Sequence, residues 1–345
     1  MIRRPSRRLL RLPLSRPPGA PATRRPRAAA AVALSLAGAL TLAGCMTVHG
    51  ERANIPSVRR AEAPKALQRF VDGYNRAYRE GDPRLVAQVE TGPLGAIGVA
   101  DVTMDRATHP HGNPDFYPLK LTDVRYAIPR QVGWPKFFVA DAASNRDGNR
   151  WLVVMTRERA DQPWRAAYLS IVAPDQLPGF ATDEDGWARA VPAGPASGLA
   201  VAPDRLSAAY TDFLMTGQGD TFAPGPSTTV ARGNRDQYRR TRTFWTEYID
   251  TPVRAPAYPP VALRTDDGQA LVFFGSQHRQ KQTMAQGVRP RPDERIRALM
   301  TGEATRAVTL TRMAESVARV PARDAADPHV VFLNRIEGVT AAKGE

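Results

Sequence analysis

The hydrophobic pattern divides the chain into an uncharged leader, a polar connection and two stretches of mixed helical and strand periodicity. Residues 28–44 carry no charged side chain. Residues 46–63 are polar and show no periodicity, which is typical of a flexible tether. The periodic part of the chain therefore begins near residue 64.

An amphipathic helix is predicted from Pro64. Its apolar residues recur with a period of 3.6 and are Leu67, Phe70, Val71, Tyr74 and Tyr78. Proline suits the first turn of a helix, and Gly81 suits the position just after the last turn. A second short helix is predicted over 84–90, followed by a glycine-rich crossover at 92–98.

Strands are predicted after this crossover. They cover residues 119–128, 136–142, 151–157 and 165–172. Asp147-Gly148 lies between the second and the third and is typical of a tight hairpin turn. One long helix, a short one and a run of strands indicate an α+β fold.

The same order of elements returns in the second half of the chain. A helix with an apolar stripe of Leu206, Ala209, Tyr210, Phe213 and Leu214 ends before Gly219-Asp220, about 138 residues after Gly81-Asp82. An aromatic-proline pair, a strand, an Asp-Gly turn and a strand occur at 134–154 and again at 258–274. Strands at 308–313 and 329–336 close the chain. Either landmark alone is weak evidence, but two in the same order indicate a duplicated domain.

The predicted organisation follows from these boundaries. It consists of a signal peptide at 1–44, a tether at 45–63, a first α+β domain at 64–191, a Pro/Gly/Ala linker at 192–203 and a second α+β domain at 204–345. Each domain is expected to pack an N-terminal amphipathic helix on a curved antiparallel sheet.

The leader carries a recognisable export signal. Nine arginines and no acidic residue precede the apolar run, which ends in Leu42-Ala43-Gly44-Cys45. This order resembles a bacterial lipoprotein signal peptide with its lipobox. The resemblance implies cleavage after Gly44, acylation of Cys45 and anchoring in the cell membrane on its extracytoplasmic face. A transmembrane helix is the alternative, but 17 residues rich in alanine lie at the lower limit of the ~17–25 that span a bilayer.

The export route stays open between two possibilities. Ser6-Arg7-Arg8-Leu9-Leu10 resembles a degenerate twin-arginine signal, whereas the remainder of the leader fits ordinary secretion equally well.

Composition narrows the classes of function. The formal net charge is +14, but from residue 45 onward only 39 basic residues oppose 34 acidic ones. Arginine outnumbers lysine 43 to 5, which together with abundant Ala, Pro and Gly indicates a high-GC bacterial genome. We therefore expect no nucleic-acid partner. Acylation of the single cysteine also excludes disulfides, cysteine metal sites and thiolate nucleophiles.

No catalytic, metal-binding or cofactor-binding residue is predicted. His109-Pro110-His111 with Asp115 has three metal-ligand side chains, but the proline and a following glycine place them in a loop. Residues 183–186 have the acidity of a calcium loop without its spaced ligands. The glycines of 92–98 fit no phosphate-binding loop, and the serine-hydrolase and zinc-protease motifs are absent from the sequence.

One strip of sequence, residues 232–248, is a candidate anionic-surface site. It contains Arg235, Arg239, Arg240 and Arg242 interleaved with aromatic residues. Arginine forks bind phosphates in a bidentate manner, so anionic lipid or a phosphate-bearing wall polymer would suit this strip. The alternative is that Tyr238, Phe244 and Tyr248 pack inward and the arginines are simply solvated.

The whole chain resembles an uncharacterised family of actinobacterial lipoproteins, and each half resembles the cystatin-like cone of nuclear transport factor 2-like domains. These resemblances imply a fold and a location but no activity. The predicted function is a membrane-anchored, non-catalytic lipoprotein that binds a ligand or another envelope protein. An envelope hydrolase or isomerase using a cone-shaped pocket is the main alternative, and an assembly factor is a third. An Asp, a His and a Tyr converging in one pocket would favour the enzyme.

Overall fold

The computed structural model describes residues 53–345, which belong to one compact unit. The structure is α+β, as predicted. Its helices are α2 (Ala63–Glu80), α3 (Pro83–Val89), α4 (Gly92–Thr108), α5 (Pro203–Thr216), α6 (Ala231–Gln237) and α7 (Glu294–Ala298), with short helical turns η1 (Pro174–Gln176), η2 (Pro195–Ser197) and η3 (Pro226–Val230).

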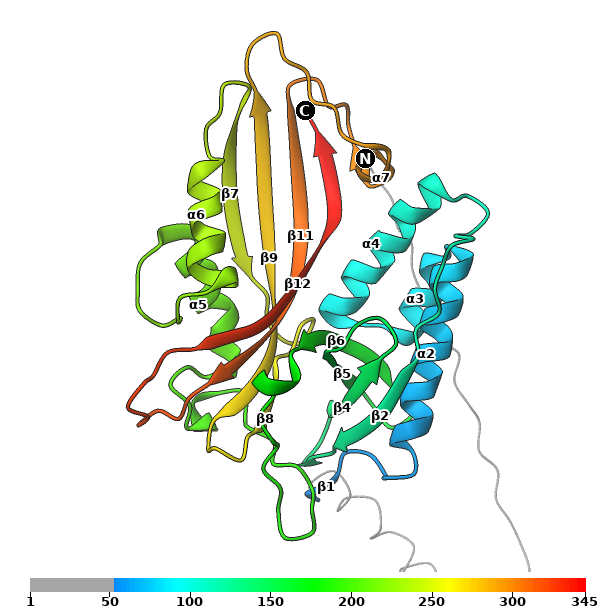
Figure 1. Cartoon of the computed structure of the whole chain (residues 1–345), viewed down its shortest axis with the longest axis vertical. Helices are drawn as coiled ribbons and strands as arrows, with labels where there is room; N and C mark the ends of the chain where they lie inside the picture. Colours follow the sequence, from blue (N-terminus) through cyan, green and yellow to red (C-terminus); the bar gives the residue numbers. More distant parts are fainter. Residues whose placement is uncertain (1–52) are drawn as a thin grey trace, which may run out of the picture. The chain divides into compact units, whose positions relative to one another are not determined.

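Two main sheets are present (Figure 1). The first has the order β2-β4-β5-β6, formed by Leu121–Ala127, Lys136–Ser144, Arg150–Arg157 and Arg165–Val172. The second has the order β10-β12-β11-β9-β7, with β8 also paired to β9. Its strands are β7 (Phe244–Pro252), β8 (Val261–Arg264), β9 (Ala270–Met284), β10 (Met300–Thr301), β11 (Ala307–Val320) and β12 (Val331–Gly344). A small ladder joins β1 (Ile55–Pro56) to β3 (Arg130–Gln131).

Three hydrophobic clusters stack these elements in layers. Leu67 and Phe70 of α2 pack with Phe138 of β4 on one face of the first sheet. The opposite face, with Val139 of β4, packs on Phe273 of β9 in the second sheet. The far face of the second sheet is covered by α5 and its neighbours. Because β4 is buried on both faces, its residues 137–140 form an apolar run rather than an alternation. The buried Asp141 that follows this run pairs with Arg150 at 2.6 Å.

The first helix and the strands of the first half agree with the sequence prediction. Gly81 follows α2 with a φ of 64°, a left-handed conformation that favours glycine. Strand β6 has the predicted bounds, and Asp147-Gly148 lies in the turn between β4 and β5.

The predicted glycine-rich crossover at 92–98 is wrong, because this segment is the first half of α4. Pro93 lies in the first turn of that helix. Gly98 faces the Glu90 carboxyl group so closely that a Cβ would lie 2.2 Å from its Oε2 atom. The glycines therefore permit close packing of a helix rather than chain flexibility.

Helix α4 lies against the second sheet although it belongs to the first half of the chain (Figure 1). Two glycines of that sheet make room for it: a Cβ at Gly275 would lie 2.9 Å from Pro93 Cγ, and one at Gly338 would lie 2.7 Å from Ile97 Cγ2. The predicted linker at 192–203 also contributes Leu199 to the α5 cluster. The two halves thus share packed surfaces, and the arrangement of each as a separate helix-on-sheet domain stays a prediction.

Candidate functional site

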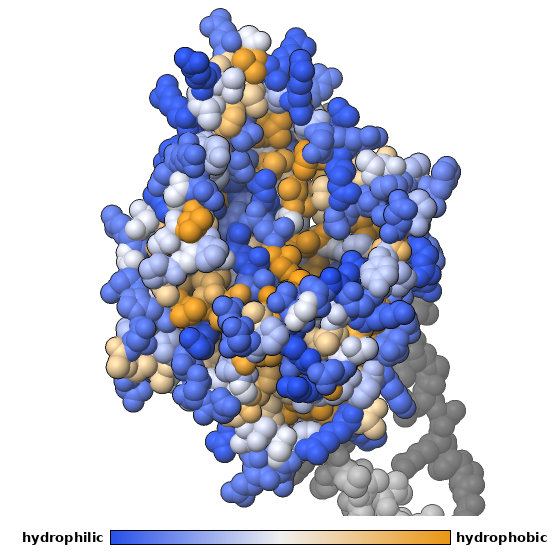
Figure 2. All heavy atoms as spheres, viewed as in Figure 1, coloured by the Kyte–Doolittle hydropathy of each residue, from blue (hydrophilic) through white to orange (hydrophobic). Residues whose placement is uncertain are grey.

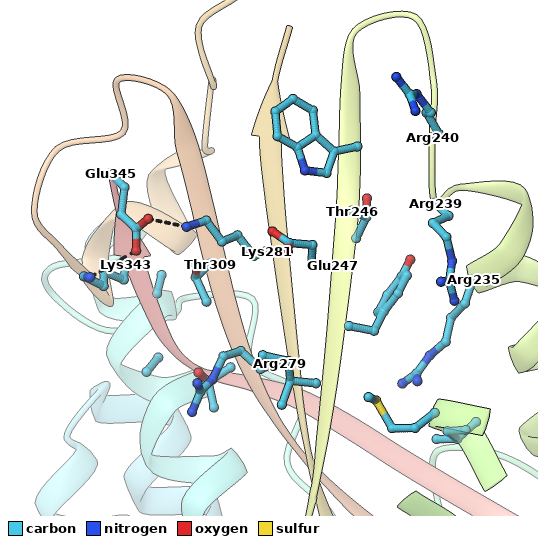
Figure 3. A pocket seen from close by; sticks show the side chains of 18 of the residues that line it. Arg235, Arg239, Arg240, Thr246, Glu247, Arg279, Lys281, Thr309, Lys343 and Glu345 are labelled. Carbon is cyan, nitrogen blue, oxygen red and sulfur yellow. Dashed lines mark hydrogen bonds and ion pairs between the residues drawn. The ribbon is translucent and has the colours of Figure 1, made fainter. Parts of the chain in front are cut away.

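A hollow of about 1180 Å³ lies along strand β7 and is called the β7 groove. Figure 3 shows its lining side chains on both sides of this strand. Side chains alternate along a strand, so Glu247 points to one face of the sheet and Thr246 to the other. Since β7 is the last strand of the sheet, the groove reaches around a free edge.

On the face of the second sheet that carries Glu247, the register of the strands places side chains in rows that run across β7, β9, β11 and β12. One row runs across Glu247, Lys281, Thr309 and Lys343, and the next across Ile249, Arg279, Thr311 and Ala341. Antiparallel pairing of long, regular strands fixes these rows, because residues directly opposite each other share a face. Three cationic side chains from β9 and β12 therefore lie close together, although the sequence separates them widely.

The groove carries an excess of positive charge. Lys281 and Lys343 both pair with the Glu345 carboxylate, at 2.5 and 3.0 Å (Figure 3). Arg279 lines the groove and pairs with no carboxylate of residues 53–345, and the same is true of Arg240 at the opposite wall. Unpaired guanidinium forks favour a ligand with phosphate or carboxylate groups.

Apolar side chains lie beside these cations. Trp245 is 40% exposed and Ile249 is 49% exposed, and both line the groove. Figure 2 shows hydrophobic residues along the hollowed part of this view, bordered by hydrophilic ones. Apolar exposure next to charge is typical of binding surfaces rather than of a plain solvated face.

The arginines proposed from the sequence do not form one surface. Arg235 on α6 forms a bidentate pair with the Asp250 carboxylate, at 2.5 and 2.9 Å. Arg239 pairs with Asp236 at 3.4 Å and lines the groove together with Arg240. Arg242 is exposed in the turn before β7.

The aromatic residues of the strip also differ in their exposure to solvent. Tyr238 and Trp245 are exposed, whereas Tyr248 is half-buried with the Arg235 guanidinium 4.8 Å from its ring. The alternative considered above, in which Tyr238, Phe244 and Tyr248 pack inward, is therefore wrong for Tyr238, whereas Phe244 and Tyr248 are half-buried.

A buried polar chain lies on the opposite face of the second sheet. His278 Nδ1 is 2.6 Å from Asp250 Oδ1, and His278 Nε2 is 2.8 Å from Ser276 Oγ. Burial by itself would raise the pKa of Asp250, but the hydrogen bonds from His278 and Arg235 lower it below the ordinary value. The ionised carboxylate only accepts, so Nδ1 carries the imidazole proton and Nε2 accepts from the serine hydroxyl.

This order of atoms is that of a Ser-His-Asp triad, but the serine has no route to a substrate. Ser276 is 0% exposed, and it lies on β9 on the face that α5 covers. Burial also lowers the pKa of His278, against the opposing effect of Asp250. The geometry is that of a fully satisfied buried network, which holds β7, β9 and α6 together.

The other sequence candidates lie apart from the groove. His109 follows the last residue of α4, and its Nδ1 atom lies 3.1 Å from Asp105 Oδ1. Asp183 and Asp185 pair with Arg130 at 3.2 and 2.7 Å. In the described range, no group of three or more His, Cys, Asp or Glu side chains is placed to hold a metal ion. Gly44 and Cys45 lie outside the described residues. Among the helices of the described part, none is long and apolar enough to cross a membrane.

Sequence reasoning found Arg235, Arg239 and Arg240 but missed the residues that β9 contributes to the groove and to the buried chain. Arg279, Lys281 and His278 lie on β9, which continues to Met284, whereas the strand predicted there ends at residue 274. The alternation Ser276-x-His278 was the available signal, since it places both side chains on one face of a strand. Their partner Asp250 comes from β7, and only pairing of the two strands brings it into contact.

Comparison with known proteins assigns the family. Two uncharacterised lipoproteins are similar to nearly the whole chain: one from Streptomyces coelicolor, 46% identical over 319 residues, and one from Streptomyces avermitilis, 44% identical over 317 residues. Each alignment covers 92% of this chain and 94% of the relative. A second uncharacterised lipoprotein of S. coelicolor is 28% identical over 285 residues, 78% of each chain. No solved structure matches significantly. Residues 55–344 match the model of the Domain of unknown function (DUF8094), so the chain belongs to this family, whose Streptomyces relatives are lipoproteins.

Proposed function

We propose that the protein is a non-catalytic envelope lipoprotein, anchored through acylated Cys45 on the extracytoplasmic face of the membrane, that binds a phosphate-bearing ligand in the β7 groove. The observation that carries the ligand class is the pair of unpartnered guanidiniums, Arg240 and Arg279, in a groove that also holds Lys281 and Lys343.

The anchor is supported by the Leu42–Cys45 motif and by the relatives that are named lipoproteins. Acylation at a site followed by a short polar tether would keep the folded part within a few nanometres of the membrane. Phosphate groups are abundant there, on anionic lipid headgroups and on wall polymers.

The ligand class follows from the groove's chemistry. Arginine offers phosphate two parallel N–H donors, and Trp245 with Ile249 offers an apolar surface for the carbon part of the ligand. Glu345 neutralises part of the lysine charge, so the arginines are expected to contribute more to affinity than the lysines.

Titration of the full-length lipoprotein in detergent tests this proposal. The two probes are poly(glycerol phosphate), a wall-polymer mimic, and glycerophosphoglycerol, the headgroup of an anionic lipid without its acyl chains. Calorimetry should show saturable binding of at least one probe, and which one binds identifies the source of the phosphate. The double variant Arg240→Gln/Arg279→Gln should weaken binding at least tenfold, since two charge-assisted hydrogen bonds of about 1.5–3 kcal/mol each would be lost.

The matched control is Arg289→Gln/Arg291→Gln, which removes the same charge from exposed positions that do not line the groove. If the groove variant and this control bind the probe with equal affinity, the proposal is wrong. An envelope hydrolase or isomerase remains the alternative function, supported by the Asp250–His278–Ser276 chain and opposed by the burial of Ser276.

We further propose that the chain arose by duplication of one cystatin-like unit. The order of helix and antiparallel strands in both halves supports this history, and superposition of residues 64–190 on residues 204–340 tests it. Failure of the helices α2 and α5 to coincide when the sheets are overlaid would count against it.

A further inference from the structure

A second, smaller cavity of about 260 Å³ lies between the second sheet and the α5–α6 side. It is lined by Tyr210, Tyr248, His278, Arg312, Arg335 and Glu337, among others. At the roughly 30 Å³ that a water molecule occupies in the liquid, the cavity has space for about nine waters. It is therefore the size of a small organic molecule or an inorganic ion, unlike the much larger β7 groove.

The charges around this cavity do not balance. Three guanidiniums, of Arg235, Arg312 and Arg335, contribute side chains that are only 13–23% exposed. They face two carboxylates: Asp250 pairs with Arg235, whereas Glu337 pairs with both Arg312 (3.3 Å from Nε) and Arg335. One partly buried positive charge is left over, and an uncompensated buried charge is costly.

The Arg335 guanidinium is only partly hydrogen-bonded. Arg335 Nε is buried and has no hydrogen-bond partner within residues 53–345. The one amide oxygen nearby, Gln280 Oε1, already accepts from Arg312 at 2.7 Å. Because Nε is buried, a ligand in the cavity would bind the terminal nitrogens of Arg335 rather than Nε.

Aromatic rings hold the guanidiniums in place before any ligand arrives. Arg335 lies 5.9 Å from the centre of the Tyr210 ring, and Arg235 lies 4.8 Å from that of Tyr248. The Tyr210 hydroxyl is itself fixed, since it donates to the Ser227 carbonyl at 2.6 Å. Preorganised donors lose little conformational entropy on binding, which favours affinity for a small ligand.

We propose that this cavity binds a small oxyanion, the carboxylate or phosphate group of a small molecule, with Arg335 and Arg312 as its main ligands. The site goes beyond the groove proposed above: it adjoins the groove at Arg235, Tyr248 and Arg279 but is built around Arg312 and Arg335, which do not line the groove. It accepts a single small group rather than a polymer or a headgroup array. Glu337 competes with the ligand for the same two guanidiniums.

The test is calorimetric titration of the full-length lipoprotein in detergent with sodium phosphate and, separately, with sodium acetate, at ionic strength matched with NaCl. Saturable binding of one or both is expected, and the stronger one identifies the ligand chemistry. Arg335→Gln should weaken this binding at least tenfold. Glu337→Gln, which removes the competing carboxylate, should strengthen it at least threefold, a gain that misfolding does not produce.

Arg240→Gln is the control, because Arg240 lines the groove but not this cavity. It should leave small-anion affinity unchanged while weakening polymer or headgroup binding, so the two proposals fail separately. Absence of saturable binding to both the wild type and Glu337→Gln would overturn the inference. Unchanged affinity in Arg335→Gln would overturn it as well, as would weaker binding in Glu337→Gln.

Discussion

The Glu315 carboxyl group on β11 accepts a hydrogen bond of 3.0 Å from the backbone amide of Leu169 on β6. Two residues further along, the Ile171 amide donates to Asn334 Oδ1 of β12 at 3.1 Å. Strand β6 is the edge of the first sheet, and these side chains occupy the donors that a further strand would otherwise pair. Side chains from the second half of the chain thus accept hydrogen bonds from the edge strand of the first sheet.

This relationship predicts different effects for two substitutions at Glu315. Burial raises the pKa of this carboxyl group well above its ordinary value and so favours its neutral form. Glu315→Gln keeps a neutral acceptor of the same shape and should change the free energy of unfolding by less than about 1 kcal/mol. Glu315→Ala leaves the Leu169 amide unpaired above a cavity and should cost about 2–4 kcal/mol. Urea denaturation of both variants checks this, and equal losses would contradict the role of the hydrogen bond.

Glu90 should make the protein less stable as the pH rises. Burial, followed by the charge of Asp101, raises the pKa of Glu90 to about 8, and neither carboxyl oxygen has a hydrogen-bond partner in the described range. The folded state thus keeps a proton that the unfolded state releases near the ordinary value of about 4.3. The contribution of this proton to the free energy of unfolding is therefore complete below about pH 4.3, and it is lost progressively as the pH rises to about 8.

Glu90→Gln should remove most of this loss, because the amide cannot ionise. The free energy of unfolding of the variant, relative to wild type, should rise by up to about 1.4 kcal/mol for each step of one pH unit between pH 5 and pH 8. Denaturant titrations at several pH values measure it, with the exposed Glu158→Gln as control. A gain that is constant with pH would show that Glu90 is ionised in the folded protein.

Gly98 and Gly233 should respond in opposite directions to alanine. Both lie inside helices, where alanine is usually favoured over glycine by about 1 kcal/mol. A Cβ at Gly98 would lie 2.2 Å from Glu90 Oε2 and 3.0 Å from Val86 Cγ1, whereas nothing lies within 4 Å of one at Gly233. Gly233→Ala should therefore raise the melting temperature, and Gly98→Ala should lower it by the equivalent of about 1–3 kcal/mol. Thermal unfolding scans measure both melting temperatures. A higher melting temperature for Gly98→Ala would show that α4 packs less closely on Glu90 and Val86 than these distances indicate.

Ser276 should not react with a fluorophosphonate probe in the folded protein. Its hydroxyl donates to His278 and is covered by α5, so the probe has no access to it. Mass spectrometry of the labelled protein measures this, with a secreted serine hydrolase as positive control. Stoichiometric labelling of Ser276 would instead establish the enzymatic alternative.

Cys45→Ala should release the protein from the membrane. The single cysteine is the only residue that the lipobox offers for acylation. Metabolic labelling with a fatty acid should be lost, and washed membranes should no longer retain the protein. Full retention of the variant would mean that something other than acyl chains holds it there.

The sequence alone determined the elements that depend on local patterns. The helix from Pro64, the strand at 165–172 and the turn at Asp147-Gly148 follow from apolar periodicity, proline and glycine placement, and turn chemistry. It also marked Leu42–Cys45, because a lipobox is a contiguous motif. It misjudged α4, since glycines that permit close packing have the same composition as glycines that permit flexibility.

Tertiary structure decided everything that depends on the pairing of distant strands. Asp250 meets His278 only because β7 pairs with β9, and Lys343 joins the row of Lys281 only through two further strand pairings. Glu315 reaches Leu169 only because the two halves pack together. Strand register and layer stacking are set by the burial of whole faces, and no short stretch of sequence carries that information.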